Sequence, residues 1–230
     1  MKHGKLKALA VGLALGAGTA QASLINAGFE VGLAAWTPGT FTGAGMATVV
    51  MSNTTTYSPG TWGAPHTFFP AAGSFFLAIR SGSAGVWQEV TQAVTLGVGE
   101  TISALARFDW GDYYVSAPSA FPDGAKVEIR DSSGASVAMP FYDDGAIHCP
   151  AFCSPGTGLA GYESPWTPWS FTASTAGTYT VVYAARNTGD GGGPNQTFGY
   201  FDAVNVPEPG SLVLLGLGLA GLGFFRRKKA

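Results

Sequence analysis

Glycine and proline interrupt this chain at short intervals, and that spacing limits what it can fold into. The 230 residues include 34 glycines and 14 prolines, and both residue types break helices and favour turns. Between them lie short runs rich in β-branched and aromatic residues. No long stretch shows the apolar period of about 3.6 residues that marks an amphipathic helix. The pattern therefore predicts an all-β protein.

About ten short strands can be placed between these turns. The expected strands are residues 23–30, 36–41, 46–53, 74–80, 86–96, 101–110, 125–131, 135–142, 168–173, 177–186 and 197–206. Residues 97–100 and 132–134 are expected to be tight turns, and 54–73, 111–124 and 143–165 long loops. Short strands joined by antiparallel-type turns predict a two-sheet antiparallel β-sandwich, most consistent with a jelly roll.

Two of the expected strands show which residues share a face. In 101–110 every second residue is apolar, which predicts a core-facing row of Ile102, Ala104, Ala106 and Phe108. In 125–131 apolar residues alternate with charged ones, namely Lys126, Glu128 and Arg130. That alternation predicts a solvent-exposed face.

The C-terminal end has the pattern of a membrane-targeting segment. Residues 212–225 contain no charge and are followed by four cations, Arg226, Arg227, Lys228 and Lys229. As a helix the run covers roughly 21 Å, short for a bilayer core of about 30 Å. Cations that follow an apolar run stay on the cytoplasmic side, so everything before residue 207 is expected outside.

The N-terminal end agrees with export. Lys2, Lys5 and Lys7 precede an apolar run at 8–17, and residues 20–22 form a small-x-small cleavage site for signal peptidase. Residues 1–22 are therefore expected to be a signal peptide and 23–206 one β-sandwich domain.

The tail resembles the PEP-CTERM sorting signal, because Pro207, Glu208 and Pro209 precede the apolar segment and the basic end. The resemblance covers 207–230. It implies processing by an exosortase-type membrane protease in a Gram-negative bacterium, with the apolar segment as a hydrophobic sorting helix that occupies the inner membrane transiently. It also implies a final place at the cell surface or in an extracellular matrix.

The predicted mature domain is acidic. Between residues 23 and 206 there are 13 acidic residues and five basic ones (Arg80, Arg107, Lys126, Arg130 and Arg186), a net charge of −8. Such a domain lacks the basic patch that nucleic acids or anionic lipids require. We expect no nucleic-acid partner.

Three short stretches resemble galactose-binding-domain-like jelly rolls, a group that includes many carbohydrate-binding modules. They are residues 26–30 with Trp36, residues 87–90 followed by 99–101, and residues 199–204. The resemblance implies a structural calcium ion where the first and last strands meet, with Glu30 and Asp202 among its ligands.

A physical argument supports a cation at these two residues. Both are flanked by aromatic residues, and a carboxylate near a core is costly unless it is paired or bound to a cation. Calcium prefers six to eight oxygen ligands, about 2.3–2.6 Å away. The alternatives are that both carboxylates face solvent, or that one pairs with Arg80 or Arg186.

Two cysteines, Cys149 and Cys153, lie four positions apart beside His148. With the histidine they could bind zinc. In an exported protein a local disulfide is the simpler expectation.

The sequence contains none of the common catalytic motifs, such as Gly-x-Ser-x-Gly or His-Glu-x-x-His. Paired loop acids could hydrolyse a glycosidic bond, and the nearest pairs are Asp109 with Asp112 and Asp143 with Asp144. Acidic residues in turns are common on any acidic β domain, so we expect that this protein is not an enzyme.

Aromatic residues in the loops favour a binding function, because sugar rings stack on aromatic faces while neighbouring polar groups bond the hydroxyls. The predicted ligand-binding set is Trp110, Asp112, Tyr113 and Tyr114, with Trp62. Other loop aromatics are Tyr142, Trp166 and Trp169, and more than half of all of them are expected only to pack. Trp36 and Trp87 are assigned to the core.

These observations predict an exported, non-catalytic β-sandwich that binds extracellular polysaccharide. The first alternative is a structural or adhesive matrix protein without saccharide preference. The less favoured alternative is a glycoside hydrolase.

Overall fold

The computed structural model describes residues 22–55, 66–110, 123–148, 163–188 and 197–203. These ranges form two five-stranded sheets, one two-stranded sheet and one short helix. The predicted all-β class is confirmed. None of the helical residues in these ranges builds a helix with the length and apolar character to cross a membrane.

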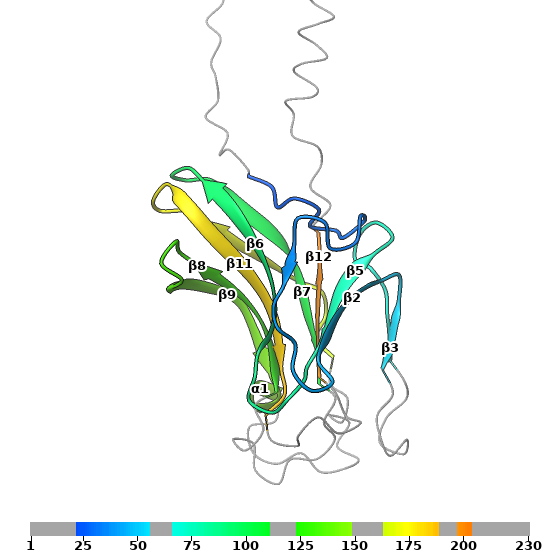
Figure 1. Cartoon of the computed structure of the whole chain (residues 1–230). Coiled ribbons are helices and arrows are strands. Elements are labelled where there is room, and N and C mark those ends of the chain that lie inside the picture. The colour runs from blue at the N-terminus through cyan, green and yellow to red at the C-terminus, as the bar shows by residue number, and fades with distance from the viewer. Residues whose placement is uncertain (1–21, 56–65, 111–122, 149–162, 189–196, 204–230) are drawn as a thin grey trace, which may run out of the picture.

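The elements follow one another along the chain as short strands (Figure 1). They are β1 (Thr37–Pro38), β2 (Met46–Val50), β3 (Asn53–Thr55), β4 (His66–Phe68), β5 (Phe76–Arg80), β6 (Gln88–Leu96), β7 (Thr101–Asp109), β8 (Gly124–Arg130), β9 (Ser136–Asp144), α1 (Gly145–His148), β10 (Thr167–Thr172), β11 (Gly177–Arg186) and β12 (Phe198–Asp202).

The main strands form one long antiparallel ribbon that is folded over on itself. Its innermost pair is β8 with β9, and outward from it β7 pairs with β10, β6 with β11, and β5 with β12. The ribbon rolls up because β11 also pairs with β8, and β12 with β7. The result is sheet A, ordered β10-β7-β12-β5-β2, and sheet B, ordered β1-β6-β11-β8-β9. This nesting is the strand order of a jelly roll, as predicted.

The core lies between the two sheets, and a stack of aromatic rings passes through it. Tyr183 of β11 stacks on Phe201 of β12 at 4.3 Å between ring centroids, and on Trp36 at 4.7 Å. The ring of Phe29 lies 5.3 Å from Trp36. The stack therefore joins sheet B, sheet A and the N-terminal segment. The predicted apolar row of the 101–110 strand also faces this core.

The N-terminal segment differs from its prediction. Residues 23–30 form a series of turns and no strand, with Asn26 and Phe29 at φ angles of 51° and 56°. A β-strand cannot contain such left-handed backbone. Gln92 of β6 fastens the segment: its Oε1 accepts the Ile25 N–H at 2.9 Å, and its Nε2 donates to the carbonyls of Ile25 and Ala35.

A second correction concerns residues 54–73, which were expected to be a loop. β3 and β4 pair as an antiparallel hairpin at its two ends. On the outer face of sheet A lies a small second core of Phe68, Phe76, Ala78 and Tyr200, with the Arg107 guanidinium 4.6 Å from the Phe68 ring centre. The hairpin thus covers part of that face.

Both predicted tight turns are present. Gly99 in the β6–β7 turn and Gly134 in the β8–β9 turn have φ angles of 80° and 85°, a conformation that favours glycine. The described chain begins and ends at the same end of the sandwich (Figure 1). The strands and the core that the described ranges contain all lie between residues 22 and 203.

Replacing Gln92 with Ala should destabilise the domain. The change removes three part-buried hydrogen bonds to the backbone of the N-terminal segment, and we expect the free energy of unfolding to fall by about 2–4 kcal/mol. Urea unfolding measures this. Thr95→Ala, on the exposed side of the same strand, serves as the control and should change stability by less than about 0.5 kcal/mol. Equal effects of the two variants would contradict the fastening role of Gln92.

Candidate binding face and carboxylate pair

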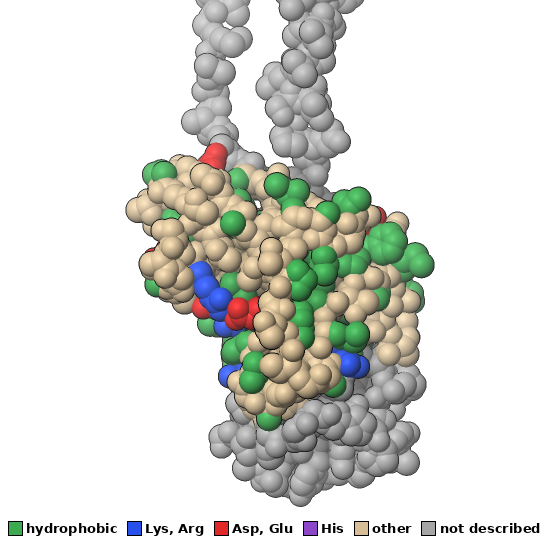
Figure 2. All heavy atoms as spheres, viewed as in Figure 1, with side chains coloured by type: hydrophobic (Ala, Val, Ile, Leu, Met, Phe, Trp, Pro, Cys, Tyr) green, Lys and Arg blue, Asp and Glu red, His purple; other side chains and the backbone are tan. Residues whose placement is uncertain are grey.

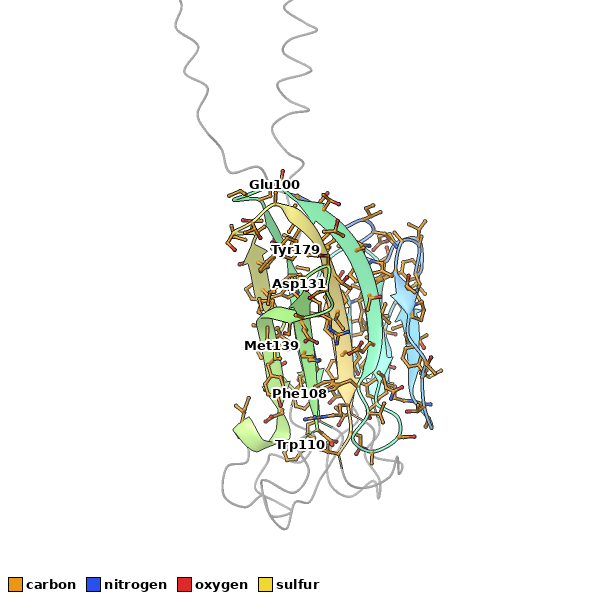
Figure 3. The ribbon with its side chains drawn as sticks, turned by 60° about the vertical axis from the view of Figure 1, so that its left-hand side comes forward. Glu100, Phe108, Trp110, Asp131, Met139 and Tyr179 are labelled. Carbon is orange, nitrogen blue, oxygen red and sulfur yellow. The ribbon has the colours of Figure 1, made fainter. Side chains whose placement is uncertain are left out.

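The outer face of sheet B carries a row of charged side chains. Val127 and Ile129 of β8 point into the core, so the alternating residues Lys126, Glu128 and Arg130 point outward. Figure 3 looks toward this side of the molecule, with Met139 of the edge strand β9 near the viewer. In Figure 2 the blue and red side chains meet on this side.

These outward residues form an ion-pair network with Glu89 of β6. Arg130 donates to both carboxylate oxygens of Glu89, at 3.0 and 2.7 Å. Its Nη2 also lies 2.8 Å from Glu128 Oε2, and Lys126 Nζ lies 2.7 Å from the same oxygen. We call these four residues the charged lane.

The charged lane is not the solvated face that the alternation predicted. Lys126 and Glu128 are both buried, and beneath them the outward side chains of Val182 and Ala184 are fully covered. The long charged side chains lie across this apolar floor, as stems of lysine and arginine commonly do. The sequence pattern located the face correctly and misjudged its exposure, because the ion pairs with another strand were not visible in it.

The ion pairs determine how Glu128 titrates. Burial acts to raise its pKa, but hydrogen bonds from Lys126, Arg130 and Ser136 outweigh burial and lower the pKa to about 2. Hydrogen bonding to Glu89 raises the pKa of Arg130. Both groups therefore remain charged at any physiological pH.

Aromatic residues flank the charged lane. Trp87 was assigned to the core, and that assignment is wrong: its ring is half-buried, with Lys126 Nζ 4.6 Å and Arg186 Cζ 4.5 Å from the ring centre. These are cation–π contacts. On β9, opposite Lys126, Tyr142 is 38% exposed.

Tyr142 is oriented by a neighbouring acid. Its hydroxyl donates to Asp144 Oδ2 at 2.6 Å, and burial together with this bond raises the pKa of Tyr142 to about 12. Asp144 Oδ1 accepts the N–H of Ile147 at the start of α1. Its two oxygens therefore serve a structural role, which argues against the catalytic pairing with Asp143.

The other predicted catalytic acid within the described ranges also has structural contacts. Asp109 is fully buried and accepts the Tyr200 hydroxyl at 3.3 Å. Its candidate partner Asp112 lies outside the described residues.

The predicted calcium ligands lie close together at the end of the sandwich where the described chain begins and ends. Asp202 accepts the N–H groups of Ala71 and Ala72 at 2.7 and 3.0 Å. Glu30 Oε1 accepts those of Ser74 and Phe75 at 2.7 and 3.1 Å. The loop 71–75 thus connects the first and last parts of the domain through two carboxylates.

This pair lacks a compensating cation among the described side chains. Burial raises the pKa of Asp202 to about 6, and the charge of Glu30 acts in the same direction. The two arginines that were considered as partners of these carboxylates have other contacts. Arg80 donates to the Ala44 carbonyl, and Arg186 lies over Trp87.

These features suit a calcium ion only in part. Two neighbouring carboxylates and an uncompensated charge favour a divalent cation. The described residues offer no group of three or more His, Cys, Asp or Glu side chains, so backbone carbonyls would have to complete the site. Calcium at Glu30 and Asp202 stays a prediction.

The predicted ligand-binding tryptophan lies elsewhere. Trp110 is only 1% exposed, belongs to the core and packs against Gly145, at the end of the sandwich opposite to Glu100 (Figure 3). A ring so covered presents no face to a sugar. Trp62, Tyr113, Tyr114, Cys149, Cys153 and residues 207–230 lie outside the described residues.

Replacing Glu128 with Gln tests the charged lane through pH. A carboxylate whose folded pKa is lowered stabilises the fold above its unfolded pKa, and this contribution disappears as the pH falls. For Glu128 the loss runs from about pH 4.5 to 2 and amounts to roughly 3 kcal/mol. Urea unfolding across that range should show a loss in the parent that exceeds the loss in Glu128→Gln by roughly 3 kcal/mol. The matched control Glu163→Gln removes a surface pair with Arg107 and should cost less than about 1 kcal/mol. The lane account fails if the parent and Glu128→Gln lose stability in parallel.

Calcium should raise the melting temperature, and Asp202→Ala should abolish that rise. Protonation competes with the cation, so the stabilisation should weaken as the pH falls below about 6, the pKa of Asp202. Calorimetry with calcium and with a chelator measures both effects. A chelator that leaves the melting temperature of calcium-loaded protein unchanged would refute the site.

Comparison with known proteins adds a motif and a set of distant structural neighbours. Residues 205–228 match the PEP-CTERM protein-sorting motif, as the tail predicted. The motif implies export and processing by an exosortase. No curated protein matches the chain.

Several solved structures are similar. TmCBM61 in complex with β-1,4-galactotriose shares 15% identity over 78% of this chain and 93% of its own, with a TM-score of 0.38. The CBM22-2 xylan-binding domain from Paenibacillus barcinonensis Xyn10C shares 15% over 77% and 95%, with a TM-score of 0.35.

A third neighbour is the enzymatically active domain of tailspike protein 4 of bacteriophage CBA120. It shares 12% identity over 79% of this chain and 20% of its own, with a TM-score of 0.37, so this chain spans about a fifth of it. With TM-scores this low the neighbours carry no argument about function, and the jelly-roll assignment rests on the strand pairing.

Proposed function

We propose that this protein is an exported, non-catalytic polysaccharide-binding protein of the cell surface or extracellular matrix, and that it binds through the outer face of sheet B. The PEP-CTERM motif at 205–228 supports the location. β12 ends at Asp202, so the motif begins three residues after the last strand of the described ranges.

The charged lane is the observation that carries the proposal. Three of the five basic residues of the 23–206 segment lie on this one face: Lys126 and Arg130, which alternate with Glu128 along β8, and Arg186, which lies over Trp87. A sugar hydroxyl both donates and accepts hydrogen bonds, so the partly exposed donor Arg130 beside the partly exposed acceptor Glu89 suits it. The ion pairs hold these groups in place before a ligand arrives, which lowers the entropy cost of binding.

Aromatic and apolar groups complete such a face. Tyr142 exposes part of its ring at the border of the lane, and its hydroxyl is directed by Asp144. A partly exposed ring with a polar tip suits the C–H face of a sugar. Trp87 contributes less as a stacking surface, because cations already contact its ring.

The charge states of the lane argue against a hydrolase there. Glycoside hydrolysis needs a carboxylic acid with a raised pKa to protonate the leaving group. Glu128 has a pKa of about 2 and two cationic neighbours, so it cannot act as that acid.

Replacing Tyr142 with Ala should weaken binding of matrix polysaccharide by about two- to tenfold, the usual contribution of one aromatic contact. Affinity electrophoresis in gels that contain polysaccharide extracted from the host bacterium measures the change. Phe69→Ala, which removes an exposed aromatic outside sheet B, should leave binding unchanged. Parent protein that migrates unretarded in such gels would refute the proposal, and release of reducing ends would establish a hydrolase in its place.

A further inference from the structure

The two main sheets have four edge strands, and three of them contain a proline. Sheet B ends in β1 with Pro38 and in β9 with Pro140, and one edge of sheet A is β10 with Pro168. Proline has no N–H to offer a further strand, so it protects an edge from pairing with another chain. The fourth edge is β2, Met46–Val50, which contains no proline.

No second strand of the described ranges pairs with the outer edge of β2. Among the described elements only β5 makes extensive contact with β2, and β5 is its only sheet partner. Every second residue of an edge strand directs its N–H and C=O away from the sheet. Two methionines mark this edge, Met46 at 45% and Met51 at 64% exposed.

The part of the chain that contains β2 has few charged residues compared with the rest of the molecule. Residues 31–79 contain no Asp, Glu, Lys or Arg, although the 23–206 segment has a net charge of −8. Figure 2 shows mainly hydrophobic and uncharged surface on the side of β2 and β5, with basic atoms only toward its lower end; β5 ends at Arg80, opposite Met46. Two copies of this acidic protein repel each other in most relative orientations. The repulsion is weakest when uncharged surfaces of the two copies face each other.

We propose that β2 is a self-association edge, through which two copies of this chain pair antiparallel and join their A sheets into one continuous sheet. The two-fold axis passes at Thr48, the middle residue of β2. Met46 then lies opposite the partner's Val50, and Ala47 opposite the partner's Val49.

This register keeps each face of the joined sheet continuous. Ala47 and Val49 pack against the main core, and Val50 packs against the second core on the outer face. Pairing at Thr48 therefore brings core-facing residues beside core-facing ones and outer residues beside outer ones. A shift by one residue would break that match.

A second copy suits this edge better than a membrane or a sugar. The open N–H and C=O groups of a strand are satisfied by another strand and not by lipid chains. A saccharide would leave the exposed methionine side chains against polar hydroxyls. A strand of the same sequence meets both requirements and adds no charge.

Oligomeric state tests the proposal without any saccharide, so its failure is independent of the binding function. Sedimentation equilibrium of the protein over a dilution series should show a species of twice the chain mass that dissociates on dilution. Thr48→Lys places two like charges across the axis and should raise the dissociation constant at least about tenfold. Val137→Lys, at a 48% exposed position on the β9 edge, should leave it unchanged.

A parent that stays monomeric at every concentration, or equal dissociation constants for the two lysine variants, would overturn the proposal. Circular dichroism verifies that Thr48→Lys is folded. If it is not, cysteine variants decide: with Cys149 and Cys153 replaced by Ser, a short bismaleimide should link Thr48→Cys into dimers and leave Val137→Cys monomeric. The reverse pattern, or no linkage, would refute β2 pairing.

Discussion

The fold depends on the stack of Tyr183 between Trp36 and Phe201. Tyr183 lies in the middle of sheet B and Phe201 in the middle of sheet A, so one pair of ring contacts holds the two halves of the ribbon together. Trp36 belongs to neither sheet and brings the N-terminal turns onto the core. Burial and the Asp202 carboxylate raise the pKa of Tyr183, so the ring remains neutral there.

This stack also determines where the outer features lie. Because Tyr183 points inward, its neighbours Val182 and Ala184 point outward and form the floor of the charged lane. Because Phe29 and Phe201 point inward, the residues that follow them, Glu30 and Asp202, reach the end of the sandwich, where the 71–75 loop meets both. The candidate binding face and the carboxylate pair therefore follow from one arrangement of the core.

Much of the fold could be predicted because local alternation carries it. The residue 177–186 strand was placed with its observed bounds, and the apolar row of β7 points inward as expected. The N-terminal segment was misjudged because left-handed backbone at Asn26 and Phe29 leaves no mark in an apolar pattern. Local bonds of the Asn26 side chain to Gly32 and Ala34 hold those turns, and the distant Gln92 of β6 fixes them to the sheet.

The candidate site was harder to predict, since it depends on which strands become neighbours. The charges on β8 were visible, but their pairing with Glu89 required the order β6-β11-β8. The predictions for Trp87 and Trp110 failed for the same reason. Trp87, expected in the core, contacts cations of β8 and β11 on the outer face. Trp110, expected to bind a ligand, is buried against Gly145, which follows β9. Residue type alone cannot distinguish a ring that packs from a ring on the surface.

The central claim is that the outer face of sheet B binds polysaccharide. Backbone amide NMR shifts recorded while oligosaccharides from the host matrix are added test it most directly. The account predicts shifts that saturate and concentrate on β6, β11, β8 and β9, with little change on β2 and β5. Shifts confined to sheet A, or no shifts at saturating sugar, would contradict it.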